Sequence, residues 1–144
     1  MINASAPTAR WRISLLGGVR ITDASGERVN PGPAKCQELL AALALEPQVA
    51  ITVGRLVGLL WGESPPRTAE KTLQTYVARL RKALGPEAIV RTGSAYRLDV
   101  DPASIDTFRF RSALMRGDIE VALQEWTGEP LAGVDADGLR PLFD

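Results

Sequence analysis

Residues 71–85 read KTLQTYVARLRKALG, and this stretch decides the fold because it carries two chemically different helical faces. At about 100° per residue, one side of the helix collects apolar side chains, with a tyrosine at its edge. These residues are Ala69, Leu73, Val77, Leu80 and Leu84, with Tyr76 at the margin. The spacing predicts that this stripe is buried and that the helix lies on the surface of a folded domain.

The opposite side of the same helix carries cations and small polar groups. Its residues are Lys71, Thr72, Thr75, Ala78, Arg79 and Lys82, with no acidic residue among them. Cations suit phosphates, hydroxyls suit phosphates or base edges, and small side chains allow a close approach to the floor of the major groove. Arg79 has the fork geometry to contact guanine through two hydrogen bonds. For an isolated helix, a solvated face without a ligand is the alternative.

A basic hairpin pattern follows the helix. Gly85-Pro86 ends the helix, and the runs AIVR (88–91) and AYRL (95–98) flank a turn at 92–94. The polar and basic residues in or beside this turn are Arg91, Thr92, Ser94 and Arg97. A helix in the major groove with a hairpin on the adjacent backbone is the winged form of helix-turn-helix recognition. The order of the two elements therefore favours DNA binding over a merely solvated face.

The residues before this helix complete a small α+β domain. Two β-prone runs at 11–16 and 19–21 flank Gly17-Gly18, and a third lies at 28–29, which predicts an antiparallel sheet. A helix is then expected between Pro33 and Pro47. Its apolar residues, Cys36, Leu39, Leu40 and Leu43, predict one buried face, with the cysteine as a small core residue.

Two more helices follow before the hairpin. Thr52 is expected to cap a short helix at 53–61, in which Val53, Leu56, Leu60 and Trp61 face inward. Pro66 is expected to open the long helix, which then spans 66–84. Two cations outside its polar face, Lys35 and Arg67, are further candidates for phosphate contacts.

After Asp101-Pro102 the pattern changes to two helical segments, at about 105–115 and 119–126, which Gly117-Asp118 separates. The second segment has an apolar stripe on which another element is expected to pack. Its residues are Ile119, Ala122, Leu123 and Trp126. The sequence thus predicts an α+β fold: a winged helix-turn-helix with an N-terminal antiparallel sheet, three helices and a C-terminal β-hairpin in residues 1–100, followed by a short all-α segment in residues 101–144.

Charge is distributed unevenly along the 144 residues, although the net charge is zero. Residues 67–97 hold 7 basic and 2 acidic residues, whereas residues 98–144 hold 4 basic and 10 acidic residues. A basic middle and an acidic end suggest that one surface meets a polyanion and the other does not. No apolar run approaches the roughly 20 residues that span a bilayer, and the opening lacks the apolar core of a signal peptide, so a cytoplasmic location is expected.

The sequence gives little support for a catalytic function. The chain has one cysteine and no histidine, which excludes an internal disulfide and removes the commonest general base and zinc ligand. It contains neither a phosphate-binding P-loop nor a G-x-S-x-G elbow. Asp135 and Asp137 lie in the glycine-rich stretch AGVDADG and are expected to be solvated. We therefore expect no enzymatic activity, no cofactor and no metal site.

Three blocks in this order resemble the actinobacterial antibiotic regulatory proteins: AKCQELLAALALEP, RLVGLLWGESPPRTAEKTLQTYVARLRKALG and AYRLDVDPASIDTFRF. The DNA-binding part of that family is itself similar to the output domain of response regulators. The resemblance covers about residues 11–110, and the run ALQEWTGEPLAG further resembles the start of the helical activation domain that follows in the family. Ala95 departs from the family, which usually has glycine before the tyrosine of the wing, so the turn is expected to rest on Gly93.

The resemblance implies a function as well as a fold. It implies a recognition helix at 66–84, a wing at 90–96, and DNA-facing positions that include Tyr76. It implies side-by-side binding of protomers to direct repeats in double-stranded promoter DNA, recruitment of RNA polymerase holoenzyme, activation of secondary-metabolite genes, and a place at the nucleoid. Because the activation domain of the family is much longer than residues 101–144, a fragment or an unusually short regulator is expected.

Two other functions stay open at this point. The output domain of a two-component response regulator has the same winged helix, although no receiver domain precedes the first sheet and the chain continues past the wing. A protein-interaction module would use the acidic end and its apolar stripes instead of the basic helix. Salt dependence separates the last alternative from DNA binding, because only phosphate contacts weaken steeply with salt.

Overall fold

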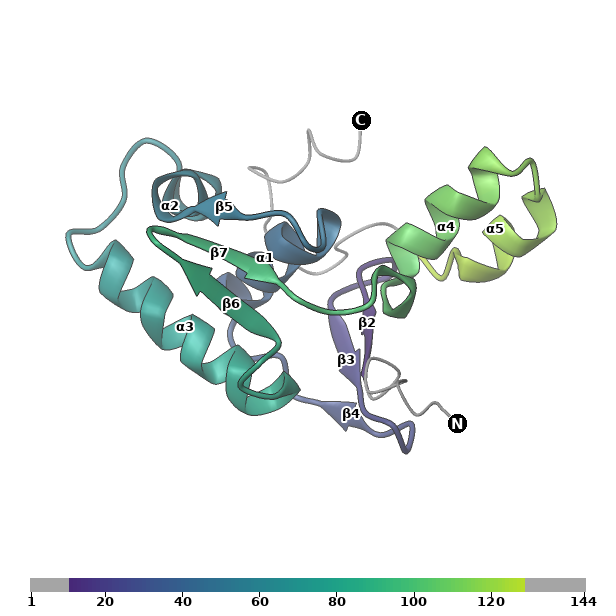
Figure 1. Cartoon of the computed structure of the whole chain (residues 1–144), viewed down its shortest axis with the longest axis horizontal. Helices are drawn as coiled ribbons and strands as arrows, with labels where there is room; N and C mark the ends of the chain where they lie inside the picture. Colours follow the sequence, from purple (N-terminus) through teal and green to yellow (C-terminus); the bar gives the residue numbers. More distant parts are fainter. Residues whose placement is uncertain (1–10, 129–144) are drawn as a thin grey trace.

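The first part of the chain forms the expected antiparallel sheet. The computed structural model describes residues 11–128 (Figure 1). Strands β2 (Arg12–Ser14), β3 (Arg20–Thr22) and β4 (Arg28–Val29) pair in that order. Gly17 and Gly18, in the turn after β2, have φ of 78° and 115°, values that other residues rarely adopt. The prediction of a three-stranded sheet is confirmed.

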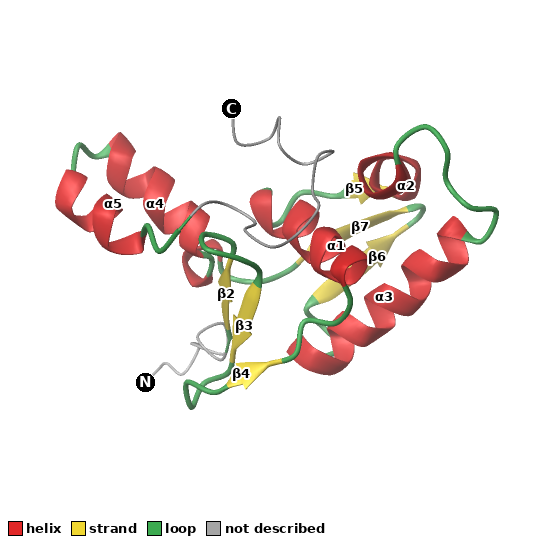
Figure 2. Ribbon diagram, turned by 180° about the vertical axis from the view of Figure 1, so that it is seen from behind, coloured by secondary structure: helices red, strands yellow, loops and turns green. Residues whose placement is uncertain are grey.

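Helix α1 (Ala34–Leu45) is the centre of the core. The four apolar residues predicted to face inward are all fully buried, and burial extends further around the helix than the spacing indicated. Ala41, Ala42 and Ala44 are also covered, and so is Glu38. In both views α1 lies between the first sheet on one side and α2, α3 and the second sheet on the other (Figures 1 and 2). Small alanine side chains allow neighbours to approach the helix from several directions.

The next two helices also follow the sequence, with one shifted boundary. Thr52 caps α2 (Val53–Trp61) by accepting a hydrogen bond from the N–H of Arg55 at 3.2 Å. Within α2, Leu56 and Leu60 are buried, whereas Val53 and Trp61 are only partly covered. Helix α3 (Ala69–Leu84) begins at Ala69 and not at Pro66. The backbone bends before it, because the N–H of Ala69 donates to the carbonyl of Pro66 in a turn.

A second three-stranded sheet contains the predicted hairpin and one strand that the sequence did not reveal. Strands β6 (Ile89–Thr92) and β7 (Ala95–Leu98) pair antiparallel, and β5 (Ile51–Thr52) pairs with the other edge of β7. The sheet order is therefore β5-β7-β6. Strand β5 contains only two residues, too few for an alternating pattern to show.

The helical segment after the second sheet consists of a 3₁₀ turn, η2 (Pro102–Ser104), and helices α4 (Asp106–Met115) and α5 (Ile119–Glu125). The two predicted helices are confirmed. Asp118 caps α5 by accepting a hydrogen bond from the N–H of Val121. Arg109 of α4 and Glu125 join the pair through two hydrogen bonds of 2.9 and 3.0 Å. The two helices project from the side of the first sheet that lies away from α3 (Figures 1 and 2).

A buried carboxylate attaches this segment to the first sheet. Asp106 accepts hydrogen bonds from the N–H of Leu15 at 2.8 Å and of Leu16 at 3.0 Å. Ile105, next to it, forms a parallel bridge with Ile13 of β2. Residues on either side of the boundary predicted near residue 100 are thus in direct contact, and the division into two domains stays a prediction.

Candidate nucleic-acid interface

The two faces of α3 lie as the sequence predicted. Ala69, Leu73, Val77, Leu80 and Leu84 are all buried, none more than 4% exposed. Lys71, Thr75, Ala78, Arg79 and Lys82 are exposed, and Thr72 is half-buried at the edge of this face. The hydroxyl of Thr75 donates to the carbonyl of Lys71 one turn earlier, at 3.2 Å. The helix therefore presents a surface of cations and small side chains that contains no carboxylate.

Tyr76 lies at the margin between the two faces, where the helical spacing placed it. It is half-buried and packs against the core, and its backbone carbonyl accepts a weak hydrogen bond from the thiol of Cys36 at 3.8 Å. Burial raises the pKa of the Cys36 thiol to about 11, against the opposing charge of Arg79. The thiol is therefore protonated at neutral pH, in agreement with its prediction as a core residue.

The hairpin has a two-residue turn. Thr92 and Ala95 form the last pair of the ladder, so the turn itself consists of Gly93 and Ser94. Gly93 has a φ of 61°, which supports the expectation that the turn rests on this glycine. All four residues from Arg91 to Ser94 are exposed, and the hairpin tip is polar.

The two arginines of the hairpin point to opposite faces. Arg91 pairs with Tyr96, and Arg97 pairs with Val90, so strand alternation separates them. Arg91 donates to the carbonyl of Gly93 at 2.9 Å and to the hydroxyl of Tyr96 at 3.3 Å, and its guanidinium lies 5.4 Å from the Tyr96 ring. The hairpin thus brings one arginine to each side of the sheet instead of both to one surface.

Arg81 fixes the position of α3 relative to the hairpin, a role that the sequence analysis missed. Its Nε and Nη2 atoms donate to the carbonyl of Ile89, the first residue of β6, at 3.0 and 2.9 Å. At about 100° per residue Arg81 lies between the two faces of α3, and helical spacing gives no sign of a backbone partner from another element. The carbonyl of Ser94 at the hairpin tip also accepts a hydrogen bond from the N–H of Val53, at 2.8 Å, which ties the tip to α2.

The two further cations differ in their surroundings. The ammonium of Lys35 donates to the carbonyl of Leu60 and lies 3.5 Å from Glu38, so it is engaged within the protein. Arg67 is exposed in the turn that leads into α3, between Pro66 and Ala69. The geometry therefore favours Arg67 over Lys35 as a phosphate contact.

The described residues contain no group of three His, Cys, Asp or Glu side chains placed to hold a metal ion. None of the helices between residues 11 and 128 combines the length and the apolar character that a membrane crossing requires. What the described surface does offer is the basic face of α3 beside the hairpin. This arrangement defines a winged-helix domain of the kind that binds duplex DNA.

Comparisons with known proteins agree with this class. Residues 27–98 match the family described as "Transcriptional regulatory protein, C terminal". The regulatory protein DnrI of Streptomyces peucetius is 31% identical over 90% of this chain and 56% of DnrI. The regulatory protein AfsR of Streptomyces coelicolor is 36% identical over 85% of this chain and 14% of AfsR. The chain thus spans little more than half of the length of DnrI and a much smaller part of AfsR.

A solved structure shows the same fold. Mycobacterium tuberculosis EmbR, in complex with a low affinity phosphopeptide, matches with a TM-score of 0.79 and 29% identity, over 92% of this chain and 40% of EmbR. The fold and the relatives together define a winged-helix transcriptional regulator. The chain belongs to the transcriptional regulatory protein, C-terminal, family, and within it to the antibiotic regulatory proteins that its sequence resembles. Its relatives are regulators, which is consistent with a protein that is not an enzyme.

Proposed function

We propose that this chain binds specific sequences in double-stranded promoter DNA, with α3 in the major groove and the β6–β7 hairpin on the adjacent backbone. The polar face of α3 carries the proposal, because it contains cations and small side chains without a carboxylate. The hydrogen bonds from Arg81 to Ile89 hold this face and the hairpin in one orientation. A fixed orientation lets two elements contact the groove and the backbone at the same time.

Different residues have different roles in this proposal. Lys71, Lys82 and Arg67 neutralise phosphates, while Thr75 and Ala78 allow the helix to approach the base edges. At the margin of the helix and on the hairpin, the candidate contacts are Thr72, Tyr76, Arg91, Thr92, Ser94 and Arg97. Since Arg91 and Arg97 lie on opposite faces of the hairpin, only one of them reaches the DNA strand beside α3. Lys35 is left out because its ammonium is already bound within the protein.

The biological role follows from the resemblance and from the regulators DnrI and AfsR. We propose an activator of antibiotic and other secondary-metabolite genes that acts at the nucleoid in the cytoplasm. Residues 1–100 bind direct repeats as side-by-side protomers, and residues 101–144 begin an activation domain that recruits RNA polymerase holoenzyme. A single module of this size covers only part of a typical site, so repeats about one helical turn apart are expected.

Selection of bound duplexes from a random DNA library tests the proposal. Enriched duplexes are then measured by fluorescence anisotropy at two salt concentrations, beside a scrambled duplex of the same composition. The proposal expects enrichment of a repeated element and an affinity that falls steeply with salt. A folded protein that enriches no sequence would contradict specific DNA binding. Binding that is independent of salt would point instead to the protein-interaction module.

A further inference from the structure

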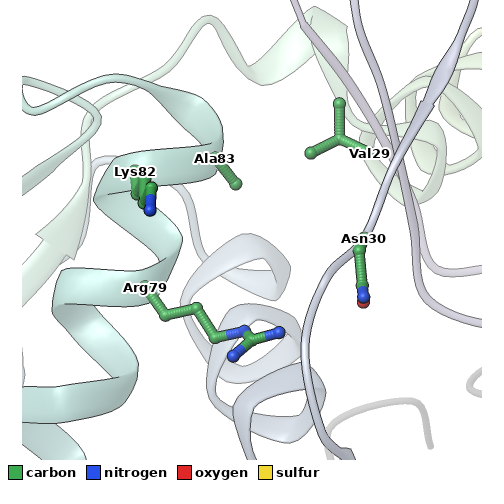
Figure 3. Close-up of a pocket in the computed structure, with 5 residues that line it drawn as sticks. All are labelled: Val29, Asn30, Arg79, Lys82 and Ala83. Carbon is green, nitrogen blue, oxygen red and sulfur yellow. The ribbon is translucent and has the colours of Figure 1, made fainter.

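An open cleft separates the first sheet from α3. It has a volume of about 360 Å³ and is lined by Val29 and Asn30 at the end of β4 and by Arg79, Lys82 and Ala83 of α3. Figure 3 shows the Arg79 side chain extending from the helix toward the segment that carries Asn30. The cleft therefore lies between the end of β4 and the C-terminal half of α3.

The polar groups of this cleft are hydrogen-bond donors. Arg79 and Lys82 are exposed, and within the described residues neither forms a hydrogen bond or an ion pair. The carbonyl oxygen of the Asn30 side chain accepts from the N–H of Gly32 at 2.8 Å, which leaves its NH₂ group free to donate. No carboxylate lines the cleft. A guanidinium, an ammonium and an amide together suit an anion with several acceptor oxygens.

Gly32 gives Arg79 its direction. A Cβ atom at this position would lie 2.7 Å from Nε and 3.0 Å from Cδ of Arg79, closer than real side chains allow. The arginine stem thus lies across the bare backbone of the loop between β4 and α1. In this conformation the guanidinium points along the flank of α3 and not straight out toward a groove floor. The prediction of a guanine contact for Arg79 requires another conformer of the side chain.

We infer that this cleft holds one backbone phosphate of the DNA, and that Gly32 is a positioning residue that directs Arg79 into it. The inference rests on the proposed function and deepens it, since it assigns Arg79 to the backbone instead of a base. A phosphate gripped between the first sheet and α3 fixes the register of the recognition helix without reading sequence. In this arrangement Lys82 and Asn30 contact the same phosphate group as Arg79.

Gly32→Ala tests the positioning without changing any charge. The matched control is Gly26→Ala, because Gly26 has a φ of 88°, close to the 94° of Gly32, but its added Cβ would meet nothing within 4 Å. Both variants place an alanine at a similar positive φ, and only at Gly32 would the added Cβ crowd Arg79; it would also lie 3.2 Å from Cβ of Cys36, a contact that the unfolding measurement monitors. Lys82→Gln provides a third variant at an exposed position where folding is not at risk. Thermal unfolding of all three checks that they remain folded.

The readout is a scan in which neutral methylphosphonates replace single phosphates of the selected duplex. For the wild-type protein and Gly26→Ala, replacement of one particular phosphate is expected to weaken binding about tenfold. This is the loss in affinity expected when one charge-assisted hydrogen bond is removed. For Gly32→Ala and Lys82→Gln, affinity should already be lower on the unmodified duplex, and the same methylphosphonate should weaken binding less than it does for the wild-type protein, because one of the donors to that phosphate is already lost. The ratio between specific and scrambled DNA should stay constant for both variants.

Two outcomes overturn the inference while the proposed function stands. If the wild-type protein binds its selected site but Gly32→Ala leaves the scan unchanged, Arg79 is not directed to a phosphate by Gly32. If Arg79→Ala instead relaxes preference at one base pair, the arginine reads a base. A folded wild-type protein that binds no duplex contradicts the proposed function and this inference together.

Discussion

Helices α3 and α5 both carry an apolar stripe, but the protein covers only one of them. In α3, Leu73 and Leu80 are completely buried, whereas in α5 Ile119 is 55% and Leu123 66% exposed. Of the α5 stripe only Ala122 is buried, and Trp126 touches the Phe110 ring at 5.4 Å between centroids. Periodicity therefore indicates which side of a helix is apolar, but the neighbouring elements decide whether that side is buried.

The two regions are also held to the protein by different forces. Helix α3 is attached by apolar burial against α1 and α2. The α4–α5 pair is attached to the first sheet by the buried Ile105 and by a polar contact that α3 lacks, the Asp106 carboxylate on the amides of Leu15 and Leu16. Arg109 and Glu125 then join the two helices to each other. Substitutions in the two regions should therefore differ in both size and pH dependence.

The largest effect is expected in α3. Leu73→Ala or Leu80→Ala removes a fully buried side chain and leaves a cavity, which should lower the free energy of unfolding by about 2 to 5 kcal/mol. Urea denaturation followed by circular dichroism measures this loss. A loss below about 0.5 kcal/mol, the range of ordinary surface substitutions, would mean that the apolar face of α3 is not the one that packs on the core.

Asp106→Asn should have the next largest effect. The variant retains one acceptor oxygen, so one of the two backbone N–H groups that Asp106 now satisfies faces an NH₂ group instead. An unsatisfied buried donor costs about 1 to 3 kcal/mol, measurable by urea denaturation at neutral pH. Asp101→Asn is the matched control, because Asp101 caps the exposed turn η2 and asparagine caps equally well. Equal losses of unfolding free energy in both variants would mean that the buried Asp106 contact stabilises the protein no more than the exposed Asp101 cap does.

The same variant makes the pH dependence of the attachment measurable. Burial raises the pKa of Asp106 above its ordinary 3.8, although the N–H groups of Leu15 and Leu16 act to lower it. The folded protein then binds this proton more tightly than the unfolded chain does, so stability falls as pH rises from 3.8 through the folded pKa. The stability of the wild-type protein relative to Asp106→Asn should decrease across that window. An increase would mean that the backbone hydrogen bonds outweigh burial.

The sequence predicted the features that repeat at regular intervals and missed those that depend on a single distant contact. The buried stripe of α3, the Thr52 cap and the hairpin around Gly93 all follow from local spacing and turn chemistry. The pairing of β5 with β7, and the contact between Asp106 and residues about 90 positions earlier, depend on the packing of the whole chain. No local pattern encodes such contacts.

The candidate site shows the same division. Helical spacing identified which residues of α3 are exposed, because that depends only on the buried stripe. It did not reveal that Arg81 binds the carbonyl of Ile89 or that Arg79 lies across Gly32, since both partners come from other elements. Nor did it show that Lys35 is engaged by Leu60 and Glu38. The sequence can predict that a cation lies at the surface. It cannot predict which group the cation contacts, because that group belongs to another element of the fold.

A smaller effect is expected on the polar face of α3. Lys71→Gln should leave the free energy of unfolding unchanged, because Lys71 is exposed, and should reduce the slope of log affinity against log salt by about 0.9, as loss of one phosphate contact does. Anisotropy titrations over a salt series give the slope. Arg116→Gln is the control, since Arg116 lies at the end of α4, far from α3 (Figure 1). An equal change in the control would indicate a general charge effect.

The smallest effect is expected at the exposed stripe of α5, and it completes the comparison with α3. Leu123→Ala removes as many carbon atoms as Leu80→Ala does, but from a side chain that is 66% exposed. The free energy of unfolding should therefore change by less than about 0.5 kcal/mol, as at other surface positions. Urea denaturation at several protein concentrations measures this change. A loss of about 2 kcal/mol or more, typical of a buried leucine, would mean that the stripe is covered in solution. If that loss grew with protein concentration, the cover would be a second copy of the chain, because only association makes stability depend on concentration.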